Sequence, residues 1–309
     1  MLVRKYNEKN KTNIDINDLL GMSQFKINIK EDFLTLSKKY SPKVLYEDYN
    51  YYAIYKPPYW VVNVSDKMAK DSDVRYNMNK NLLQVWLYKN LMYPNRNKIE
   101  FGYGICNRLD VNTSGIVLVA KNEPSYHYLR QIINDHKLTE KKYFALVAGH
   151  IENNGQITTG IKCIEGNRFG TNTCFNSDQG KYALTEFEIL AYLDDKDGNK
   201  YTLLNIRIHT GRTHQIRVHM KMLNTYIIGD HIYTKDTKSY EVESKLVPRI
   251  FLHAYNYNFV DKQGKKIKSY APLSEDLLSA LTINFKSSDE NFNLDDVVYI
   301  LSNPQVLDK

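Results

Sequence analysis

A polar turn at residues 107–115 leads directly into a continuous apolar run, and this junction constrains the fold more than any other stretch. The turn reads Asn-Arg-Leu-Asp-Val-Asn-Thr-Ser-Gly, and the apolar residues 116–120 follow it. A short apolar run bounded by a turn is typical of a buried strand. Asn, Thr, Ser and Gly bend the backbone tightly and hydrogen-bond to it. We therefore expect Asp110 to lie on a rigid loop at the end of a core strand, where a carboxylate is useful for chemistry.

Asp110 also has an ordinary structural interpretation. An aspartate that precedes Asn-Thr-Ser is a common turn cap, and Arg108 could be its surface ion-pair partner. These nine residues alone do not decide between a structural and a catalytic aspartate. The decision depends on the rest of the chain.

The size and charge of the chain fit a folded protein with an anionic partner. It has 309 residues, 42% of them hydrophobic, which suffices for one large domain or two ordinary ones. Residues 275–309 contain seven acids and two lysines, a net charge of −5, so the total of +7 leaves +12 on residues 1–274. A basic body suits a polyanionic partner such as nucleic acid, although many proteins with this charge bind none.

The three cysteines predict neither a metal site nor a disulfide framework. Cys106, Cys163 and Cys174 lack the paired spacing of zinc ligands, and their number is odd. We therefore expect a reducing, intracellular compartment that the sequence does not specify further. No apolar run approaches the roughly 18 residues of a membrane span. The first residues contain no apolar signal core, so we expect no membrane association.

Local patterns predict both strands and helices along the chain. Alternation or β-rich runs predict strands, and helical spacing with an Asn-Glu-Pro start at residue 122 predicts helices. Residues 150–180, which contain several glycines, are interpreted as loop-rich, and residues 262–264 as a hairpin turn. The predicted strands are 44–46, 52–55, 116–120, 143–148, 185–190 and 203–209, and the predicted helices are 82–92, 122–137, 212–223, 275–281 and 294–301.

A basic segment follows the predicted strand at 203–209. In a helix that begins near Arg212, the side chains of His214 and Arg217 would line one face. A helix N-terminus beside Gly211 that carries these residues could bind a phosphate group. A solvated basic face is the alternative interpretation.

Taken together, these segments resemble the RluA-type pseudouridine synthases, and the resemblance covers residues 43–273. The segments occur in the order that this family shows. Two of them, 107–115 and 210–220 (Thr-Gly-Arg-Thr-His-Gln-Ile-Arg-Val-His-Met), are long and specific. The stretches that carry the resemblance are 46–48, 56–57, 107–115, 142–149, 180–187, 210–220, 229–233 and 252–254.

The resemblance implies an α+β fold, in which helices and loops surround a bent, mostly antiparallel sheet and a basic cleft with Asp110 at its floor. It implies an isomerase that converts uridine to pseudouridine in tRNA or rRNA. The N1–C1′ bond is broken and C5 is joined to C1′, without a cofactor or a metal. We expect a monomer whose partner is RNA.

The same resemblance assigns the catalytic residues. Asp110 matches the essential aspartate, which could attack C1′ as a nucleophile or remove a proton from C2′ as a base. Arg217 matches the arginine that pairs with it, and we expect a bidentate contact that orients the carboxylate. Tyr143 matches the tyrosine that packs on the uracil and whose hydroxyl could assist proton removal from C5.

Five further residues are candidates for substrate binding. Arg108 matches a residue that enters the RNA stack when the uridine is flipped out. Thr113 belongs to the turn beside Asp110. We expect Arg212, His214 and Gln215 to contact the RNA backbone or to shape the pocket.

The chain departs from the family pattern at several places. Asn107 stands where the family usually has histidine, and Lys56-Pro57 lacks the glycine that commonly follows. Residues 1–42 form an N-terminal extension without a clear S4-type domain, 43–273 the catalytic domain, and 274–309 an acidic helical tail. A non-catalytic RNA-binding or RNA-folding factor on the same scaffold is the alternative function. A glycosidase would need a second carboxylate, for which Asp230 is the candidate.

Overall fold

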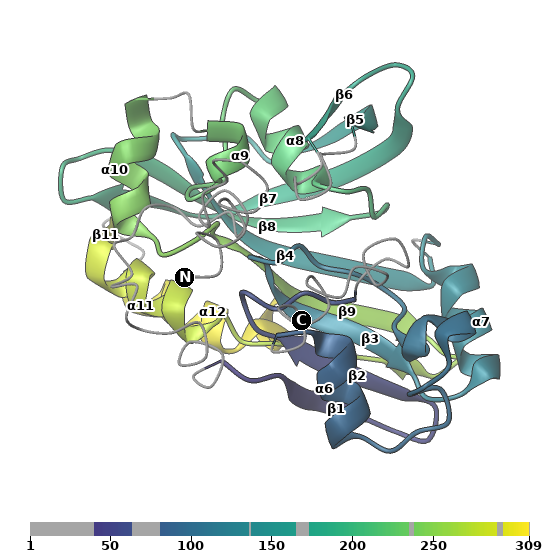
Figure 1. Cartoon of the computed structure of the whole chain (residues 1–309). Coiled ribbons are helices and arrows are strands. Elements are labelled where there is room, and N and C mark those ends of the chain that lie inside the picture. Colours follow the sequence, from purple (N-terminus) through teal and green to yellow (C-terminus); the bar gives the residue numbers. More distant parts are fainter. Residues whose placement is uncertain are drawn as a thin grey trace, which may run out of the picture.

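The computed structural model describes residues 40–63, 81–135, 137–164, 173–234, 238–288 and 293–308. In this part of the chain, eleven strands form one sheet, in the order β1-β2-β3-β9-β4-β8-β7-β5-β6, with β10 beside β9 and β11 beside β7 (Figure 1). The strands are β1 (Lys43–Glu47), β2 (Tyr51–Lys56), β3 (Ser114–Ala120), β4 (Thr139–Ala148), β5 (Gly155–Ile164), β6 (Thr173–Asn176), β7 (Lys181–Asp195), β8 (Lys200–Ile208), β9 (Leu252–Val260), β10 (Lys266–Ile267) and β11 (Phe285–Ser287).

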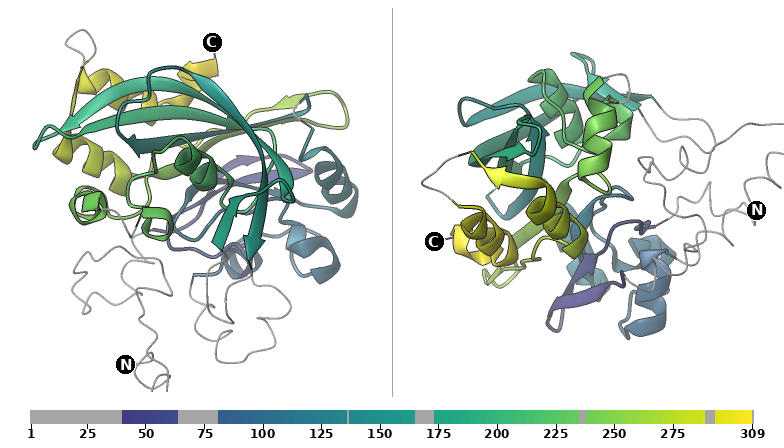
Figure 2. Two further views of the ribbon diagram at one scale, coloured as in Figure 1. Left: turned by 90° about the horizontal axis from the view of Figure 1, so that it is seen from above. Right: turned by 90° about the vertical axis from the view of Figure 1, so that its left-hand side faces the viewer.

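Helices cover both faces of this sheet, which is strongly bent (Figure 2). Helices α8 to α10 lie on one side, and the C-terminal helices α11 and α12 lie on the other. The helices are α6 (Leu83–Asn90), η1 (Ile99–Gly104), α7 (Glu123–Ile132), α8 (Gln215–Met222), α9 (His231–Thr234), α10 (Lys238–Leu246), α11 (Glu275–Asn284), α12 (Leu294–Ser302) and η2 (Pro304–Asp308). None of the described helices has the length and apolar character needed to cross a bilayer.

Nearly all neighbouring strands are antiparallel, which confirms the predicted α+β class. The exception is the β3–β9 pair, which is parallel and short, with Ser114 opposite His253 and Gly115 opposite Ala254. This pair joins strands β1 to β3 to the rest of the sheet. The turn that carries Asp110 ends where β3 begins, so Asp110 lies at the junction of the two halves.

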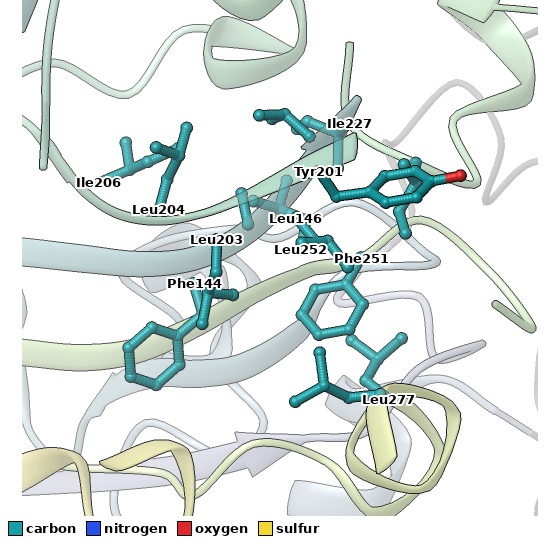
Figure 3. Packing of buried hydrophobic residues seen from close by; sticks show 14 of the residues in the cluster. Phe144, Leu146, Tyr201, Leu203, Leu204, Ile206, Ile227, Phe251, Leu252 and Leu277 are labelled. Atoms are coloured by element: carbon teal, nitrogen blue, oxygen red, sulfur yellow. The ribbon is translucent and has the colours of Figure 1, made fainter. Parts of the chain in front are cut away.

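The largest buried cluster surrounds β4, β7 and β8 (Figure 3). Leu146 and Leu203 are opposite each other on neighbouring strands, and both are buried. Leu277 of α11 and Leu301 of α12 are fully buried in the same cluster. The two helices predicted for the acidic tail are therefore confirmed, and their apolar faces pack into the core. The predicted extension at 1–42 lies almost entirely outside the described residues.

The prediction of a loop-rich region over residues 150–180 is wrong for the part that forms β5 and β6, whereas residues 165–172 lie outside the described residues. Two of its glycines permit close strand approach instead of ending the strands. A Cβ added to Gly160 would lie 2.2 Å from the carbonyl oxygen of Ser177, and one added to Gly180 would lie 2.5 Å from the Ile161 nitrogen. A residue with a side chain fits neither position, since these distances are far below van der Waals contact.

The expectation of unpaired cysteines is also wrong. Cys163 and Cys174 lie opposite each other on β5 and β6 and form a disulfide, with Cα atoms 4.0 Å apart. Cys106 is the buried free cysteine. Counting cysteines missed the pair because the rule considers number and spacing, whereas the pairing depends on strand register.

Glu243 on α10 is a buried carboxyl group with an incomplete set of partners. Its side chain is 3% exposed, Tyr226 donates a hydrogen bond of 2.9 Å to Oε1, and Oε2 accepts none among the described residues. Burial raises the pKa of Glu243 to about 7, although the Tyr226 hydrogen bond lowers it. The folded protein therefore binds this proton more tightly than the unfolded chain does.

This difference predicts a pH effect on stability. Because the folded-state pKa is raised, the Glu243 contribution to the free energy of unfolding is greatest at low pH and is lost as pH rises from about 4.5 to about 7. The Glu243→Gln side chain cannot ionise, so the variant does not lose this contribution. As the pH rises from 5 to 8, the free energy of unfolding of the variant should therefore increase relative to that of the wild type by on the order of 1–3 kcal/mol. Urea unfolding at several pH values measures this difference. The exposed Glu152→Gln variant is the control, and equal pH profiles for all three proteins would contradict the prediction.

Candidate active site

The loop that carries Asp110 is fixed by contacts with its backbone. The Thr113 nitrogen donates to the Asp110 carbonyl oxygen at 3.1 Å and closes the turn. The Val111 carbonyl oxygen accepts from the Tyr59 nitrogen at 2.9 Å and from Lys56 Nζ at 3.1 Å. The Asp110 side chain itself remains 34% exposed. The expected rigid loop is therefore present, and its carboxylate is accessible.

Lys56 holds this loop through backbone carbonyl groups. Its ammonium group is fully buried and donates to the carbonyl oxygens of Pro57, Trp60 and Val111 at 2.9–3.1 Å. Burial, followed by the charge of Arg249, places the pKa of Lys56 well below its ordinary value. Lys56 thus has a structural function, which its place in the Lys-Pro pair did not reveal.

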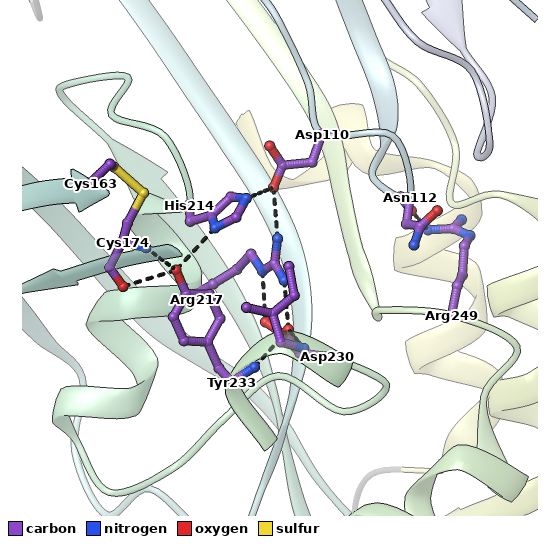
Figure 4. A network of polar contacts seen from close by, with 10 residues as sticks. Asp110, Asn112, Cys163, Cys174, His214, Arg217, Asp230, Tyr233 and Arg249 are labelled. Atoms are coloured by element: carbon purple, nitrogen blue, oxygen red, sulfur yellow. Dashed lines mark hydrogen bonds and ion pairs between the residues drawn. A yellow bond between two sulfur atoms is a disulfide. The ribbon is translucent and has the colours of Figure 1, made fainter. Parts of the chain in front are cut away.

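Arg249 supports the loop through a second set of contacts. It is 1% exposed, and it donates to the Asn112 carbonyl oxygen at 2.8 Å and to Ser114 Oγ at 2.9 Å (Figure 4). Asp276 of α11 neutralises it through two contacts of 2.7 and 3.1 Å. The loop ends at Gly115, where φ is +126° and a Cβ would lie 2.2 Å from the Ala254 oxygen. Only glycine fits this position.

Asn107 also connects the loop to β3. Its Oδ1 accepts a hydrogen bond from the Leu118 nitrogen at 2.7 Å, and its Nδ2 donates to the Ile116 carbonyl oxygen at 3.3 Å. The residue that departs from the family pattern therefore has a defined structural function here.

Helix α8 brings Arg217 to Asp110, which lies 107 residues earlier in the chain. The Arg217 Nη1 atom is 3.2 Å from Asp110 Oδ2. The expected bidentate contact is made with another residue, since Nε and Nη2 donate to the two oxygens of Asp230 at 2.7 and 2.6 Å (Figure 4). Arg217 has three nitrogens, and Asp230 takes the two that form a parallel pair. Only Nη1 remains for Asp110.

The Arg217–Asp230 pair is buried and ionised. Burial alone would raise the pKa of Asp230, but the Arg217 guanidinium holds it below its ordinary value. Asp230 is 1% exposed and its two oxygens are occupied by Arg217. It cannot act as the second catalytic carboxylate that a glycosidase would need. The Tyr233 ring lies against the guanidinium, 5.1 Å from centroid to Cζ.

The predicted helix start at Arg212 is wrong. α8 begins at Gln215, because His214 has a φ of +56° and serves as the residue before the first turn. His214 therefore does not lie on the helix face with Arg217, but both side chains still reach Asp110, and His214 Nε2 is 3.8 Å from Asp110 Oδ2. Arg217 is engaged with carboxylates, so it is not available to bind phosphate at this helix end.

Gln215 and Thr113 shape the site from within the protein. Gln215 is 3% exposed, and its amide bonds to Thr210, Arg212 and Thr185 at 2.7–3.0 Å. Thr113 is 2% exposed. The structure therefore does not favour the predicted substrate contacts of these two residues, because neither side chain is accessible to an RNA.

Three candidates face outward or toward Asp110. Arg108 is exposed and forms no hydrogen bond or ion pair with the described residues. Arg212 is half-buried, and its Nε donates to the Tyr182 carbonyl oxygen at 2.8 Å. Tyr143 on β4 is half-buried, and burial together with the Asp110 carboxylate raises its pKa. Tyr143 is therefore a neutral phenol close to Asp110.

Successive side chains of β4 point to opposite faces of the sheet, so this site and the C-terminal tail contact different faces of the strand. Lys142 forms an ion pair of 3.2 Å with Asp308 on one face of the sheet. Tyr143, the next residue, points to the other face, as successive strand residues do.

No group of three or more potential metal ligands occurs in the described ranges.

Comparison with known proteins identifies the family. Residues 50–222 match the RNA pseudouridylate synthase family. The chain belongs to this family. It is related to the RluA-type enzymes, which are isomerases that form pseudouridine in RNA. The prediction made from the sequence motifs is therefore confirmed at the level of family and reaction.

Two relatives show the extent of the similarity. "Ribosomal large subunit pseudouridine synthase D" of Borreliella burgdorferi is 34% identical over 209 residues, which cover 67% of this chain and 60% of the relative. "Dual-specificity RNA pseudouridine synthase RluA" of Vibrio parahaemolyticus is 30% identical over 227 residues, 73% of this chain and 80% of the relative.

A solved structure supports the fold. The structure titled "Human RNA Pseudouridylate Synthase Domain Containing 1" has a TM-score of 0.56 and 21% identity, and the similarity covers 84% of this chain and 94% of that one. The likeness extends over most of both chains, so the bent sheet with its flanking helices is the fold of pseudouridylate synthases.

The two carboxylates on Arg217 should differ in their effect on stability. Asp230→Asn leaves a buried guanidinium without its main charge partner, which typically costs about 3–5 kcal/mol. Asp110→Asn removes a contact at a partly exposed group and should cost less than about 1 kcal/mol. Urea unfolding of both variants measures the difference. Equal losses would show that Asp230 is not the main partner.

The support from Arg249 can be separated from general stability. Arg249→Met leaves Asp276 buried and unpaired and should destabilise by about 3–5 kcal/mol. The double variant Arg249→Met/Asp276→Leu should recover much of this loss, because an apolar pair can replace a buried ion pair.

Activity should not recover in the double variant. The hydrogen bonds from Arg249 to the Asn112 carbonyl oxygen and to Ser114 Oγ are still missing, so the Asp110 loop is held less firmly. Pseudouridine formation measured beside urea unfolding tests this. A double variant that is both stable and fully active would contradict a function of Arg249 in positioning the loop.

Proposed function

We propose that Asp110 is the catalytic carboxylate with which this enzyme converts a uridine of rRNA or tRNA to pseudouridine. The observation that carries the proposal is the geometry at Arg217. Asp230 occupies two nitrogens of the buried guanidinium, and the third lies 3.2 Å from the carboxylate of Asp110. A buried, fixed cation thus orients the partly exposed carboxylate of Asp110.

The two oxygens of Asp110 differ in their environment. Oδ2 contacts Arg217 and lies near His214, whereas Oδ1 accepts no hydrogen bond from the described residues. Oδ1 is therefore the oxygen that is free to react. It could attack C1′ of the ribose or remove the proton from C2′, and both reactions require the ionised carboxylate.

Tyr143 and Arg108 complete the proposed site. The Tyr143 ring is close to Asp110 and can pack on the flipped uracil. Its raised pKa keeps the hydroxyl protonated, so a contribution to proton removal at C5 would require the phenol to pass its own proton on. Arg108 is exposed beside Asp110 and can fill the place that the uridine leaves in the RNA stack.

The names of two relatives and the charge of the chain support the proposal of rRNA or tRNA as the substrate. One relative is named for the large ribosomal subunit and another for dual specificity. The basic body of the chain suits either RNA. We propose that the enzyme acts as a monomer.

Tritium release from RNA transcripts labelled with [5-³H]uridine tests the proposal. The wild-type protein should release tritium from tRNA or large-subunit rRNA, and Asp110→Asn should reduce the release to background. The exposed Asp178→Asn variant is the control and should retain full activity. Release that persists in Asp110→Asn would refute the assignment of this carboxylate.

Two substitutions at Tyr143 separate its ring from its hydroxyl. Tyr143→Phe keeps the ring, so it should bind RNA normally and lose activity only if the hydroxyl takes part in the reaction. Tyr143→Ala should also weaken RNA binding, because stacking on a base is worth about 1–3 kcal/mol. RNA binding by the wild type without any tritium release would support the alternative of a non-catalytic RNA-binding factor.

A further inference from the structure

The hydroxyl of Tyr233 serves both backbone polar groups of Cys174. Its oxygen accepts a hydrogen bond from the Cys174 nitrogen at 3.1 Å and donates to the Cys174 carbonyl oxygen at 3.0 Å. β6 is the last strand of the sheet order and has β5 as its neighbour on one side. On the other side, the backbone nitrogen and carbonyl oxygen of Cys174 face the Tyr233 hydroxyl. These backbone groups are buried, so each of them needs a partner.

The same hydroxyl has a third neighbour, His214. Its Nδ1 atom lies 3.0 Å from the Tyr233 oxygen (Figure 4). A phenol has one proton to donate. It donates this proton in the hydrogen bond to the Cys174 carbonyl oxygen, because a carbonyl oxygen can only accept. The contact with His214 can then be a hydrogen bond only if Nδ1 carries a proton and donates it. Tyr233 thereby fixes the tautomer of His214.

The other ring nitrogen of His214 faces Asp110. Burial, and then the neighbouring Arg217, lower the pKa of His214 below its ordinary value of 6.5. The ring is therefore neutral near pH 7, and its proton is on Nδ1, so Nε2 carries a lone pair. The separation of 3.8 Å between Nε2 and Asp110 Oδ2 agrees with two acceptors that cannot hydrogen-bond to each other.

We infer that His214 Nε2 accepts a hydrogen bond from the 2′-hydroxyl of the target nucleotide. This inference rests on the proposed function, in which Asp110 acts at C1′ or C2′ of the ribose. A group 3.8 Å from that carboxylate lies beside the sugar. The 2′-hydroxyl is the donor attached to C2′, whereas the N3–H of uracil lies on the far side of the base from C1′.

The contact makes His214 a residue that distinguishes RNA from DNA at the reacting nucleotide. The 2′-hydroxyl is the group by which proteins recognise ribose. Without it, the buried Nε2 acceptor would lose its partner, and an unpaired buried acceptor is unfavourable. Specificity would thus arise at the catalytic carboxylate itself, and not only along the RNA backbone.

The tautomer can be measured without any RNA. Long-range ¹⁵N–¹H spectra of histidine-labelled protein distinguish a protonated from an unprotonated ring nitrogen, and the His214→Asn variant identifies the His214 signals. Near pH 7 we expect a protonated Nδ1 and an unprotonated Nε2. Tyr233→Phe should weaken this preference. A proton on Nε2 in the wild type would overturn the inference.

Recognition of the hydroxyl is tested by a double-mutant cycle. The two RNAs are the stem-loop that gives tritium release with the wild type and the same RNA with 2′-deoxyuridine at the target. Both are bound to Asp110→Ala, which prevents turnover, and to Asp110→Ala/His214→Asn. Alanine is used at residue 110 because an Asn amide could itself donate to Nε2. Asn is suited to residue 214 because it tolerates the left-handed backbone found there.

The loss of Nε2 should weaken binding of the ribose RNA by roughly two- to twelvefold, the usual worth of one hydrogen bond. Binding of the deoxyribose RNA should not change. An equal loss for both RNAs would show that His214 is only structural and would overturn the inference, while the Asp110 assignment would stand. Failure of the wild type to release tritium would instead overturn the proposed function.

Discussion

The guanidinium of Arg217, held between Asp230 and Asp110, is the interaction on which the site depends. A buried cation is strongly unfavourable unless a carboxylate neutralises it. Asp230 meets this requirement with two short hydrogen bonds from a side chain that is 1% exposed. The remaining nitrogen is then fixed in direction, toward Asp110. Of the two carboxylates on Arg217, that of Asp110 is the partly exposed one.

A fixed cation is useful only if the carboxylate is fixed as well, and the loop before β3 provides this. Lys56 and Arg249 donate hydrogen bonds to its backbone carbonyl groups. Gly115 lets β3 approach β9 more closely than any other residue would allow. Both lysine and arginine are buried, so salt screens these contacts much less than it screens contacts at the surface. The result is a rigid support with one exposed side chain, which suits a reaction that requires accurate placement of an oxygen.

The sequence predicted the components of the site better than their connections. Motifs identified Asp110, Tyr143 and Arg217, and the structure brings them together. The bidentate pairing of Arg217 with Asp230 was not predicted, because spacing along the chain does not reveal which of two carboxylates an arginine reaches. Arg249 lies in no charge pattern, and its partner belongs to the acidic tail, so their ion pair becomes visible only when the chain is folded. The Cys163–Cys174 disulfide was not predicted either, because it depends on the register in which β5 pairs with β6.

Asn107, at which the chain departs from the family pattern, connects the Asp110 loop to its strand. Its amide donates to one backbone carbonyl of β3 and accepts from one backbone nitrogen. An amide can form both bonds because it carries a donor and an acceptor. This end of the loop therefore depends on a side chain that hydrogen-bonds in both directions, whereas Gly115 at the other end is needed because a Cβ there would lie 2.2 Å from the Ala254 oxygen.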